Sequence, residues 1–411
     1  MQLSSSVNKV IFFNHQIPQK RTLRGQTMLK HLFKLIWKQK KSNFLMMLEI
    51  FVSFLILFAI WSLGVYYFQN YNIPAGSNTN NVWVLFCEFN SDTLREQKRE
   101  LVSQKLRSYP QVESFAFSEN NVPFSFSSNN NQLEYKNNEV MCEMMRVEPE
   151  MKKVLNLEKI SGKWLSLADK VNKYPPLVIN RAAKIKLFGE ENAVGKILGE
   201  KEDEKRQVIG VVENFKYKSD YHEVTPLAMT LVSKWAKVCL IKVKPSADID
   251  FEAKLTKELI NLGSGWSMEV QHMENMKANK NKMNWIPILI LIIVCGFLIF
   301  NVALGLFGVL FQTISRRKQE IGVRRAMGAT QNAILWQFIG ETAVIATFGV
   351  LLGTFFAIQF PLLNVFDLPA SVYLMGLLLA IFSVYLIVII CAFLPSKQAS
   401  KVYPAIALHE E

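Results

Sequence analysis

Four long apolar runs limit what this 411-residue chain can fold into more than any other feature of its sequence. A transmembrane helix needs roughly 20 consecutive apolar residues, and each run reaches that length with few internal charges. Buried core helices of a soluble protein are the alternative, but four such runs in one chain favour membrane spans. The predicted spans are 44–68, 286–311, 333–360 and 371–394.

Charge is distributed unevenly along the chain, and this gives the spans a direction. Residues 1–43 carry nine Lys or Arg and no acid, and residues 316–325 carry five cations and one acid. Residues 69–284, by contrast, carry 31 cations and 28 acids. Segments rich in Lys and Arg stay on the cytoplasmic side of a membrane. We therefore expect a multi-pass membrane protein with these segments in the cytoplasm: 1–43, 312–332 and the tail 395–411.

The net charge of +13 does not indicate nucleic-acid binding. The excess of cations lies beside the membrane spans and not on a folded domain, which is the positive-inside pattern. We expect contact with membrane lipid and no nucleic-acid partner.

The first apolar run is too long and begins too late for a cleavable signal peptide. It therefore predicts an uncleaved anchor. Residues 1–27 lack periodicity, whereas Met28 begins a basic, amphipathic lead-in to the first span. This contrast favours Met28 as the natural start of the protein.

Residues 69–284 are too many for a loop and are expected to fold as an extracytoplasmic domain. The domain begins and ends with the same pattern, a strand, then an amphipathic helix, then a strand. Two such units predict a split α+β sheet. The fold class is thus a membrane protein of four transmembrane α-helices, with a large α+β extracytoplasmic domain inserted between helices 1 and 2. Residues 118–235 are predicted to form an inserted subdomain. The expected strands and helices of the two units are 81–89, 93–108, 112–117, 237–243, 251–262 and 266–270.

The outer domain offers no pattern typical of an active site. The sequence has no Ser/His/Asp set and no His or Cys spacing typical of a metal site. Residues 189–196 resemble a phosphate-binding loop, but they have five residues between the glycines and Ile after the Lys. We therefore predict no catalytic, cofactor or metal residues and a non-catalytic subunit.

Two cysteines of the outer domain lie on matching strands of the two units. A disulfide between Cys87 and Cys239 is one interpretation, because the predicted compartment is oxidising. Two buried free thiols are the other and favoured interpretation.

The loop after the second span is the main candidate site. We expect one helix over 315–328, lying along the membrane surface. The i, i+3, i+4, i+7 rule places Arg317, Glu320, Ile321 and Arg324 on one face. Glu320 can pair with Arg316 and Arg324. Gly328 is expected to end the helix and Thr330 to cap the next one.

Three polar residues fall inside predicted spans, where polar side chains are functional candidates. Glu341 and Asn301 are the stronger two. Glu341 is expected to bond across a dimer or to the 315–328 helix, or else to be solvated. Glu49 lies near the inner end of the first span and is expected to reach water. Glycines that would allow close helix contact are Gly305, Gly308, Gly349 and Gly353.

Several motifs resemble one family. The segment 316–330, Arg-Arg-Lys-Gln-Glu-Ile-Gly-Val-Arg-Arg-Ala-Met-Gly-Ala-Thr, is similar to the cytoplasmic signature of MacB/FtsX/LolC-type ABC transporter permeases. The tail 395–408 is similar to that family's C-terminus, and residues 178–189 and 208–219 resemble two blocks of its extracytoplasmic domain. The resemblance covers most of the chain from about Met28.

The resemblance implies a permease that binds no cofactor itself and is driven by a separate cytoplasmic ABC ATPase carrying ATP and Mg²⁺. The resemblance further implies a bacterial inner (plasma) membrane. Because members with a fused ATPase carry it N-terminally, the N-terminal segment 1–43 leads us to expect the ATPase on another chain. The resemblance also implies a homodimer or a pair with a paralogous permease, and a periplasmic adaptor as a further partner. The residues implied in coupling to the ATPase are Arg316, Arg317, Glu320, Ile321, Gly322, Arg324, Arg325 and Gly328.

The expected function is mechanotransmission: ATP hydrolysis by the partner moves the stalk helices, and the outer domain works on or exports a substrate. Peptides, antibiotics and lipoproteins all stay open as substrates. The alternative is a receptor or scaffold whose outer domain senses a ligand and signals to a cytoplasmic partner.

Overall fold

The computed structural model describes residues 40–88, 94–233, 236–263 and 265–400. These residues form two compact units. The head comprises residues 63–292, and the membrane unit comprises the described residues of 1–62 and 293–411. Helices α2 and α7 are the two helices with residues in both units.

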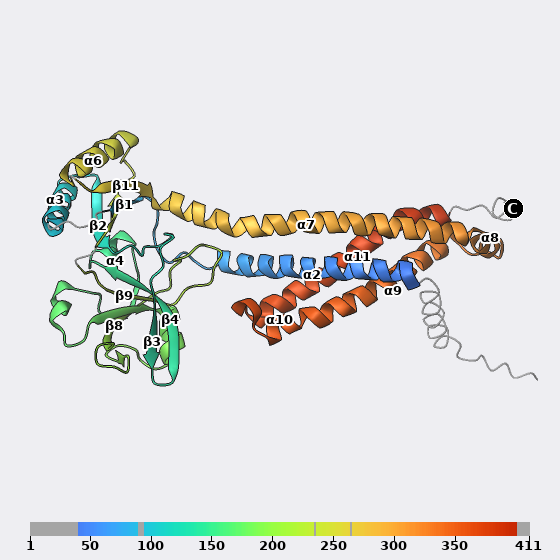
Figure 1. Cartoon of the computed structure of the whole chain (residues 1–411), viewed down its shortest axis with the longest axis horizontal. Coiled ribbons are helices and arrows are strands. Elements are labelled where there is room, and N and C mark those ends of the chain that lie inside the picture. Colours follow the sequence, from blue (N-terminus) through green and yellow to red (C-terminus); the bar gives the residue numbers. More distant parts are fainter. Residues whose placement is uncertain (1–39, 89–93, 234–235, 264, 401–411) are drawn as a thin grey trace, which may run out of the picture. The chain divides into compact units, whose positions relative to one another are not determined.

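Among the described residues, four helices are long and apolar enough to cross a membrane, which confirms the four predicted spans. The helices extend beyond the apolar runs because helical hydrogen bonds do not require apolar side chains. In Figure 1 they are α2 (Lys40–Tyr71), α7 (Met273–Arg316), α9 (Gln331–Ala357) and α11 (Ala370–Ser400), with the short α10 (Gln359–Leu362) and η2 (Val365–Asp367) between the last two.

Glycines bring α2 close to its neighbours in the membrane unit. A Cβ atom at Gly349 or Gly353 of α9 would lie 2.9 or 2.2 Å from side chains of α2. A Cβ at Gly305 of α7 would lie 3.0 Å from the Glu49 carboxylate of α2. The expectation of close contact is thus confirmed for these three glycines. It is wrong for Gly308 within the described residues of this chain, because no atom lies within 4 Å of a Cβ built there.

The head is built on one sheet whose described strands follow the order β11-β1-β10-β2-β4-β9-β6-β8-β5, with β3 beside β4 and β7 beside β8. The strands are β1 (Val82–Glu88), β2 (Val112–Ser118), β3 (Asn130–Tyr135), β4 (Asn138–Val147), β5 (Lys159–Gly162), β6 (Pro176–Asn180), β7 (Ile197–Leu198), β8 (Arg206–Val212), β9 (Leu227–Leu231), β10 (Val238–Val243) and β11 (Ser267–His272). The helices are α3 (Arg95–Arg107), α4 (Met151–Val154), η1 (Leu167–Val171), α5 (Arg181–Phe188) and α6 (Ile249–Leu262).

The two predicted strand–helix–strand units are present and interleave. They are β1-α3-β2 and β10-α6-β11, and β10 lies between β1 and β2. Alternate residues of β1, including Trp83 and Leu85, are buried in one cluster with Leu106 of α3 and Leu255 of α6. Both helices therefore cover the same face of this half of the sheet, as a split α+β arrangement requires.

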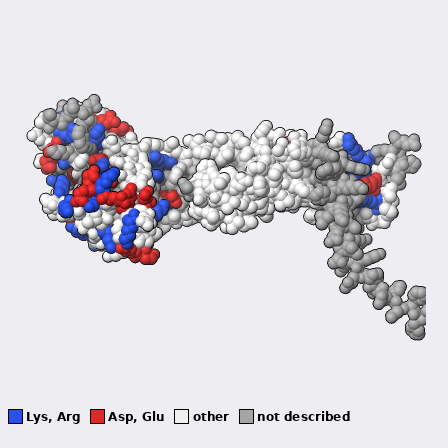
Figure 2. Space-filling model, turned by 60° about the horizontal axis from the view of Figure 1, so that its bottom comes forward, with Lys and Arg blue, Asp and Glu red and all other residues white. Residues whose placement is uncertain are grey.

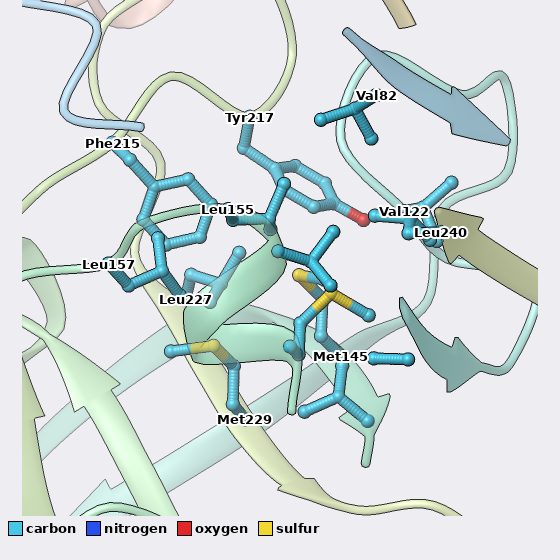
Figure 3. Packing of buried hydrophobic residues seen from close by; sticks show 14 of the residues in the cluster. Val82, Val122, Met145, Leu155, Leu157, Phe215, Tyr217, Leu227, Met229 and Leu240 are labelled. Atoms are coloured by element: carbon cyan, nitrogen blue, oxygen red, sulfur yellow. The ribbon is translucent and has the colours of Figure 1, made fainter. Parts of the chain in front are cut away.

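The segment predicted as an inserted subdomain contributes β3 to β9 and continues the same sheet. It joins the first half through one residue pair, Ser118 of β2 with Val147 of β4. A hydrophobic cluster also crosses this junction, with Leu240 of β10 and Met145 of β4 in the same core (Figure 3). That 118–235 is an inserted subdomain stays a prediction.

Cys87 and Cys239 are both buried free thiols. Cys239 pairs with Leu85 across the β1–β10 ladder, and Cys87 lies two residues further along β1. Burial raises the pKa of the Cys87 thiol to about 12. The favoured interpretation, two unreactive thiols, agrees with this arrangement.

Charged side chains are distributed differently over the head and the membrane unit. On the visible face in Figure 2, Lys, Arg, Asp and Glu cover the head and reappear around α8 (Lys318–Ala326), while the described surface of the spanning helices in that view carries none. An uncharged helix surface is what hydrocarbon requires.

Candidate functional site

The predicted helix over 315–328 is two helices. Helix α7 ends at Arg316, and α8 begins at Lys318. Between them Arg317 has φ −106° and ψ 16°. Its N–H donates to the carbonyls of both Thr313 and Ile314, at 3.1 Å each. The shared, tightened turn ends the first helix, so the expectation of one continuous helix is wrong.

The end of α8 has the predicted glycine stop. Gly328 has φ +94°. Its N–H donates to the Arg325 carbonyl, and the N–H of Ala329 donates to the Arg324 carbonyl at 3.0 Å. This is a Schellman motif, which needs a left-handed residue at the glycine position. The Thr330 side chain then accepts from the Ala333 N–H and caps α9, so both predicted signals are confirmed.

The inner face of α8 is apolar. Ile321 is 4% exposed and lies in a small cluster with Ile334 and Phe338 of α9. Gly322 beside it is also buried. Ile321 attaches α8 to α9, and neither of these two buried residues offers surface to a partner. Their part in coupling stays a prediction, and in this arrangement they can act only by holding α8 in place.

Five polar residues form a closed ring of hydrogen bonds between α8 and α9. Arg317 donates to Glu320 at 3.0 Å and to Glu341 at 2.9 Å. Arg324 donates to Glu320 at 2.5 Å and to Gln337 at 2.7 Å. Gln337 closes the ring by donating to Glu341 at 3.0 Å. We call these residues the latch: Arg317, Glu320, Arg324, Gln337 and Glu341.

The latch is electrically balanced, with two guanidinium groups and two carboxylates. The side chains of Arg317 and Glu341 are each only 16% exposed, so this pair is screened less than a surface ion pair. The Arg317 guanidinium also lies 5.5 Å from the centre of the Phe338 ring. A partly buried, fully hydrogen-bonded ring fixes one orientation of α8 on α9.

The intramembrane candidates differ in their partners. Glu341 accepts a hydrogen bond from Arg317, in the turn between α7 and α8. A bond to the 315–328 segment was one of the open alternatives for Glu341. Asn301 donates to the Phe297 carbonyl of its own helix at 2.9 Å. A side chain satisfied one turn away in its own helix has no need of another helix. The structure therefore brings Glu341, and not Asn301, to the candidate site.

The outer face of α8 contains residues that the sequence analysis missed. Gln319, Val323 and Met327 follow one another at i, i+4, i+8, and all three are exposed. Met327 is 76% exposed and Val323 is 43% exposed. The sequence did carry a signal for this face, because Val323 and Met327 are apolar residues among charged ones and are spaced to lie on one side of a helix. Arg316 is exposed as well, while Arg325 donates to the Ala329 carbonyl at 2.9 Å and supports the helix end.

The charged groups of the latch pair with one another. The exposed side of α8 is a short ridge whose apolar members are Val323 and Met327. Among the described residues, no group of three or more His, Cys, Asp or Glu is placed to hold a metal ion.

Two protein families match the chain. The FtsX-like permease C-terminal family matches residues 281–404, which include the latch and α8. The MacB-like periplasmic core domain family matches residues 44–257, more than half of the chain. The chain belongs to the MacB/FtsX family of ABC transporter permeases. Its head is the extracytoplasmic α+β domain of that family, between the first and second of four transmembrane helices.

Curated relatives agree with this assignment. The macrolide export ATP-binding/permease protein MacB of Bdellovibrio bacteriovorus is 24% identical over 297 residues, covering 68% of this chain and 46% of the relative. The uncharacterized ABC transporter permease YknZ of Bacillus subtilis is 30% identical over 115 residues, covering 28% of this chain and 29% of the relative. This permease thus spans less than half of the length of either protein.

A solved structure resembles the head. The periplasmic region of MacB from Actinobacillus actinomycetemcomitans is 16% identical and has a TM-score of 0.36. The likeness covers 51% of this chain and 97% of the solved one.

Proposed function

We propose that this permease is a mechanotransmitting subunit, in which α8 takes up movement from an ABC ATPase. One observation carries the proposal: the Arg317–Glu341 ion pair, which closes the latch and fixes α8 on α9. A docking helix can pass on a displacement only if it does not rotate or slide on its support. The latch and the Ile321 cluster both provide that support, through contacts to α9.

The surface offered to the ATPase is the ridge of Gln319, Val323 and Met327. An exposed, apolar ridge about two turns long fits a shallow groove of a partner, with Arg316 at its edge for a carboxylate of that partner. Latch residues orient this ridge and do not themselves make the main contact.

We place the latch and the chain termini in the cytoplasm and the head outside, following the excess of Lys and Arg in 1–43 and 316–325. ATP and Mg²⁺ are held by the ATPase, on another chain. Two permeases, alike or paralogous, form the complex, with a periplasmic adaptor as a further partner. The head handles a peptide, an antibiotic or a lipoprotein at the outer face of the membrane.

The test uses the full chain in lipid nanodiscs and asks which protein co-purifies with it. We expect an ABC ATPase whose ATP hydrolysis the permease stimulates. Met327→Asp and Glu320→Lys should each reduce that stimulation at least about tenfold, because a buried charge or a broken latch opposes docking. Met283→Ser in the head is the matched control, since Met283 is also more than half exposed.

The other function considered, a receptor or scaffold, predicts a different partner on the same ridge. Co-purification of a kinase or hydrolase, with no ATPase, would support that function. Passage of a solute across sealed vesicles by the permease and its ATPase would contradict handling at the outer face.

A further inference from the structure

Residues 213–226 connect strands β8 and β9. They contact α2 and α7, the two helices that have residues in both units. We propose that this segment, which we call the clasp, is where the head receives movement of α2 and α7. The inference rests on the proposed force-transmitting function, and it adds the place in the head at which the force arrives.

A buried lysine ties the clasp to α2. The side chain of Lys216 is almost fully buried, and its ammonium donates to the carbonyls of Asn70 at 2.9 Å and His222 at 3.0 Å. A buried cation must keep such partners, because an unpaired one is costly. The Glu223 N–H also donates to the Tyr66 hydroxyl of α2 at 3.2 Å. Both contacts reach the last turns of the helix.

Hydrogen bonds and an ion pair tie the clasp to α7. Lys277 lies 3.0 Å from the Asp220 carboxylate. Asn281 accepts from the Asp220 N–H at 3.1 Å and donates to the Asp220 carboxylate at 2.8 Å. Asn284 donates to the Ser219 hydroxyl at 3.0 Å. The three residues of α7 follow i, i+4, i+7, so one helix face makes every contact.

One aromatic ring contacts both helices. The Tyr221 ring is stacked on Tyr71 with centroids 5.5 Å apart and lies 5.6 Å from Tyr67. It also meets Trp285 of α7 edge to face, with centroids 5.5 Å apart. Aromatic pairs at these distances attract beyond the effect of burial alone. Tyr221 therefore links α2 to α7 through the head.

The opposite side of the clasp is fixed in the core of the head. Phe215 and Tyr217 lie among the buried residues of the main cluster, close to Leu155 (Figure 3). The Tyr217 hydroxyl bonds to Asn121, and its carbonyl accepts from the Phe124 N–H at 2.8 Å. A loop that only joined two strands would need none of these contacts. A shift of either helix must therefore displace the clasp, and with it the ends of β8 and β9.

Hydrogen exchange of the full chain in nanodiscs tests the clasp without any ATPase. Tyr221→Ala should raise amide exchange about tenfold or more in three segments together, 66–72, 213–226 and 277–285. The Tyr221 ring joins these segments, so they should open as one cooperative unit when it is removed. Tyr174→Ala in the same head, which removes a half-buried tyrosine bonded to Glu202, is the matched control. Faster exchange in 213–226 alone, or in none of the three, would overturn the proposal.

A second variant keeps the test valid if Tyr221→Ala does not fold. Asn281→Asp places a second carboxylate beside Asp220 and should loosen 213–226 and 277–285. Adding Asp220→Asn should reverse the change, and failure to reverse it would contradict the α7 contact.

Adding the ATPase separates this inference from the proposed function. With ATP, exchange in β8 and β9 should change in the unmodified permease and stay constant in Tyr221→Ala while hydrolysis continues. A change that persists in the variant would show another route into the head. Absence of any ATPase stimulation would instead contradict the function at α8, and the nucleotide-free exchange result would still stand.

Discussion

The guanidinium of Arg317 donates to the carboxylate of Glu341 across 2.9 Å. Arg317 lies in the turn between α7 and α8, and Glu341 lies in the N-terminal half of α9. The two residues lie 24 positions apart in the chain. Each also belongs to the closed hydrogen-bond ring of the latch. The pair therefore joins three helices at one point, and the proposed transmission through α8 rests on this contact.

Glu341→Gln should weaken the latch while keeping its shape. Loss of a hydrogen bond between charged, partly buried groups costs about 1–3 kcal/mol, so the variant should unfold more easily and stimulate the ATPase less. A double-mutant cycle with Arg317→Met should depart from additivity by about 0.5 kcal/mol or more. Asn301→Leu is the control and should leave both quantities unchanged, because Asn301 bonds only within its own helix. Additive effects of the two latch variants would mean that the ion pair is not coupled.

Gly353→Ala and Gly308→Ala make a matched pair in the membrane unit. The first would bring a methyl group to 2.2 Å from the Phe54 ring, whereas the second has open space. Overpacking of this kind costs about 1–3 kcal/mol. We expect a lower unfolding temperature in detergent for Gly353→Ala only, with partial recovery on adding Phe54→Leu. Equal effects of the two glycine variants would contradict the packing of α9 on α2.

Acid should destabilise the head through His222. Burial lowers the pKa of His222 below its ordinary value of 6.5, and Lys218, Lys216 and Lys280 lower it further against an opposing effect of Glu223. As the pH falls through 6.5, the unfolded chain binds the proton first, so stability decreases until the lower pKa of the folded state is passed. Above 6.5 this contribution to stability is fully present.

The measurement for His222 is the free energy of unfolding at several values between about pH 7.5 and pH 5. His222→Gln should remove part of the loss of stability on acidification. Lys218→Met should remove a smaller part, because it deletes only one of the neighbouring cations. An identical pH dependence in all three proteins would refute the role of His222.

The buried thiols of the head should resist modification until it unfolds. Burial raises the pKa of Cys87 to about 12 and that of Cys142 to about 12, and it raises the pKa of Cys239 as well. Only thiolates react rapidly with a maleimide. Mass spectrometry should find these cysteines unmodified in the native protein and fully modified after denaturation without reductant. A Cys87–Cys239 pair that stays unmodified after denaturation would reveal a disulfide.

The amino-acid sequence by itself determined the features that depend on near neighbours. Apolar runs specified the four spans, and alternating or helical periodicity located the two strand–helix–strand units of the head. Gly328 and Thr330 marked the end of α8 and the start of α9, because a left-handed glycine and a side-chain cap act within one turn.

Only the tertiary structure decided which distant groups meet. Periodicity placed Ile321 with Arg317 and Arg324 on one face, and only packing decided that this face lies against α9 and that Val323 and Met327 lie outside. The partner of Glu341, the inclusion of Gln337 in the latch, and the contact of Tyr221 with both α2 and α7 all join residues of different elements. Such pairings are set by how helices and strands pack together, and no local pattern of residues records them.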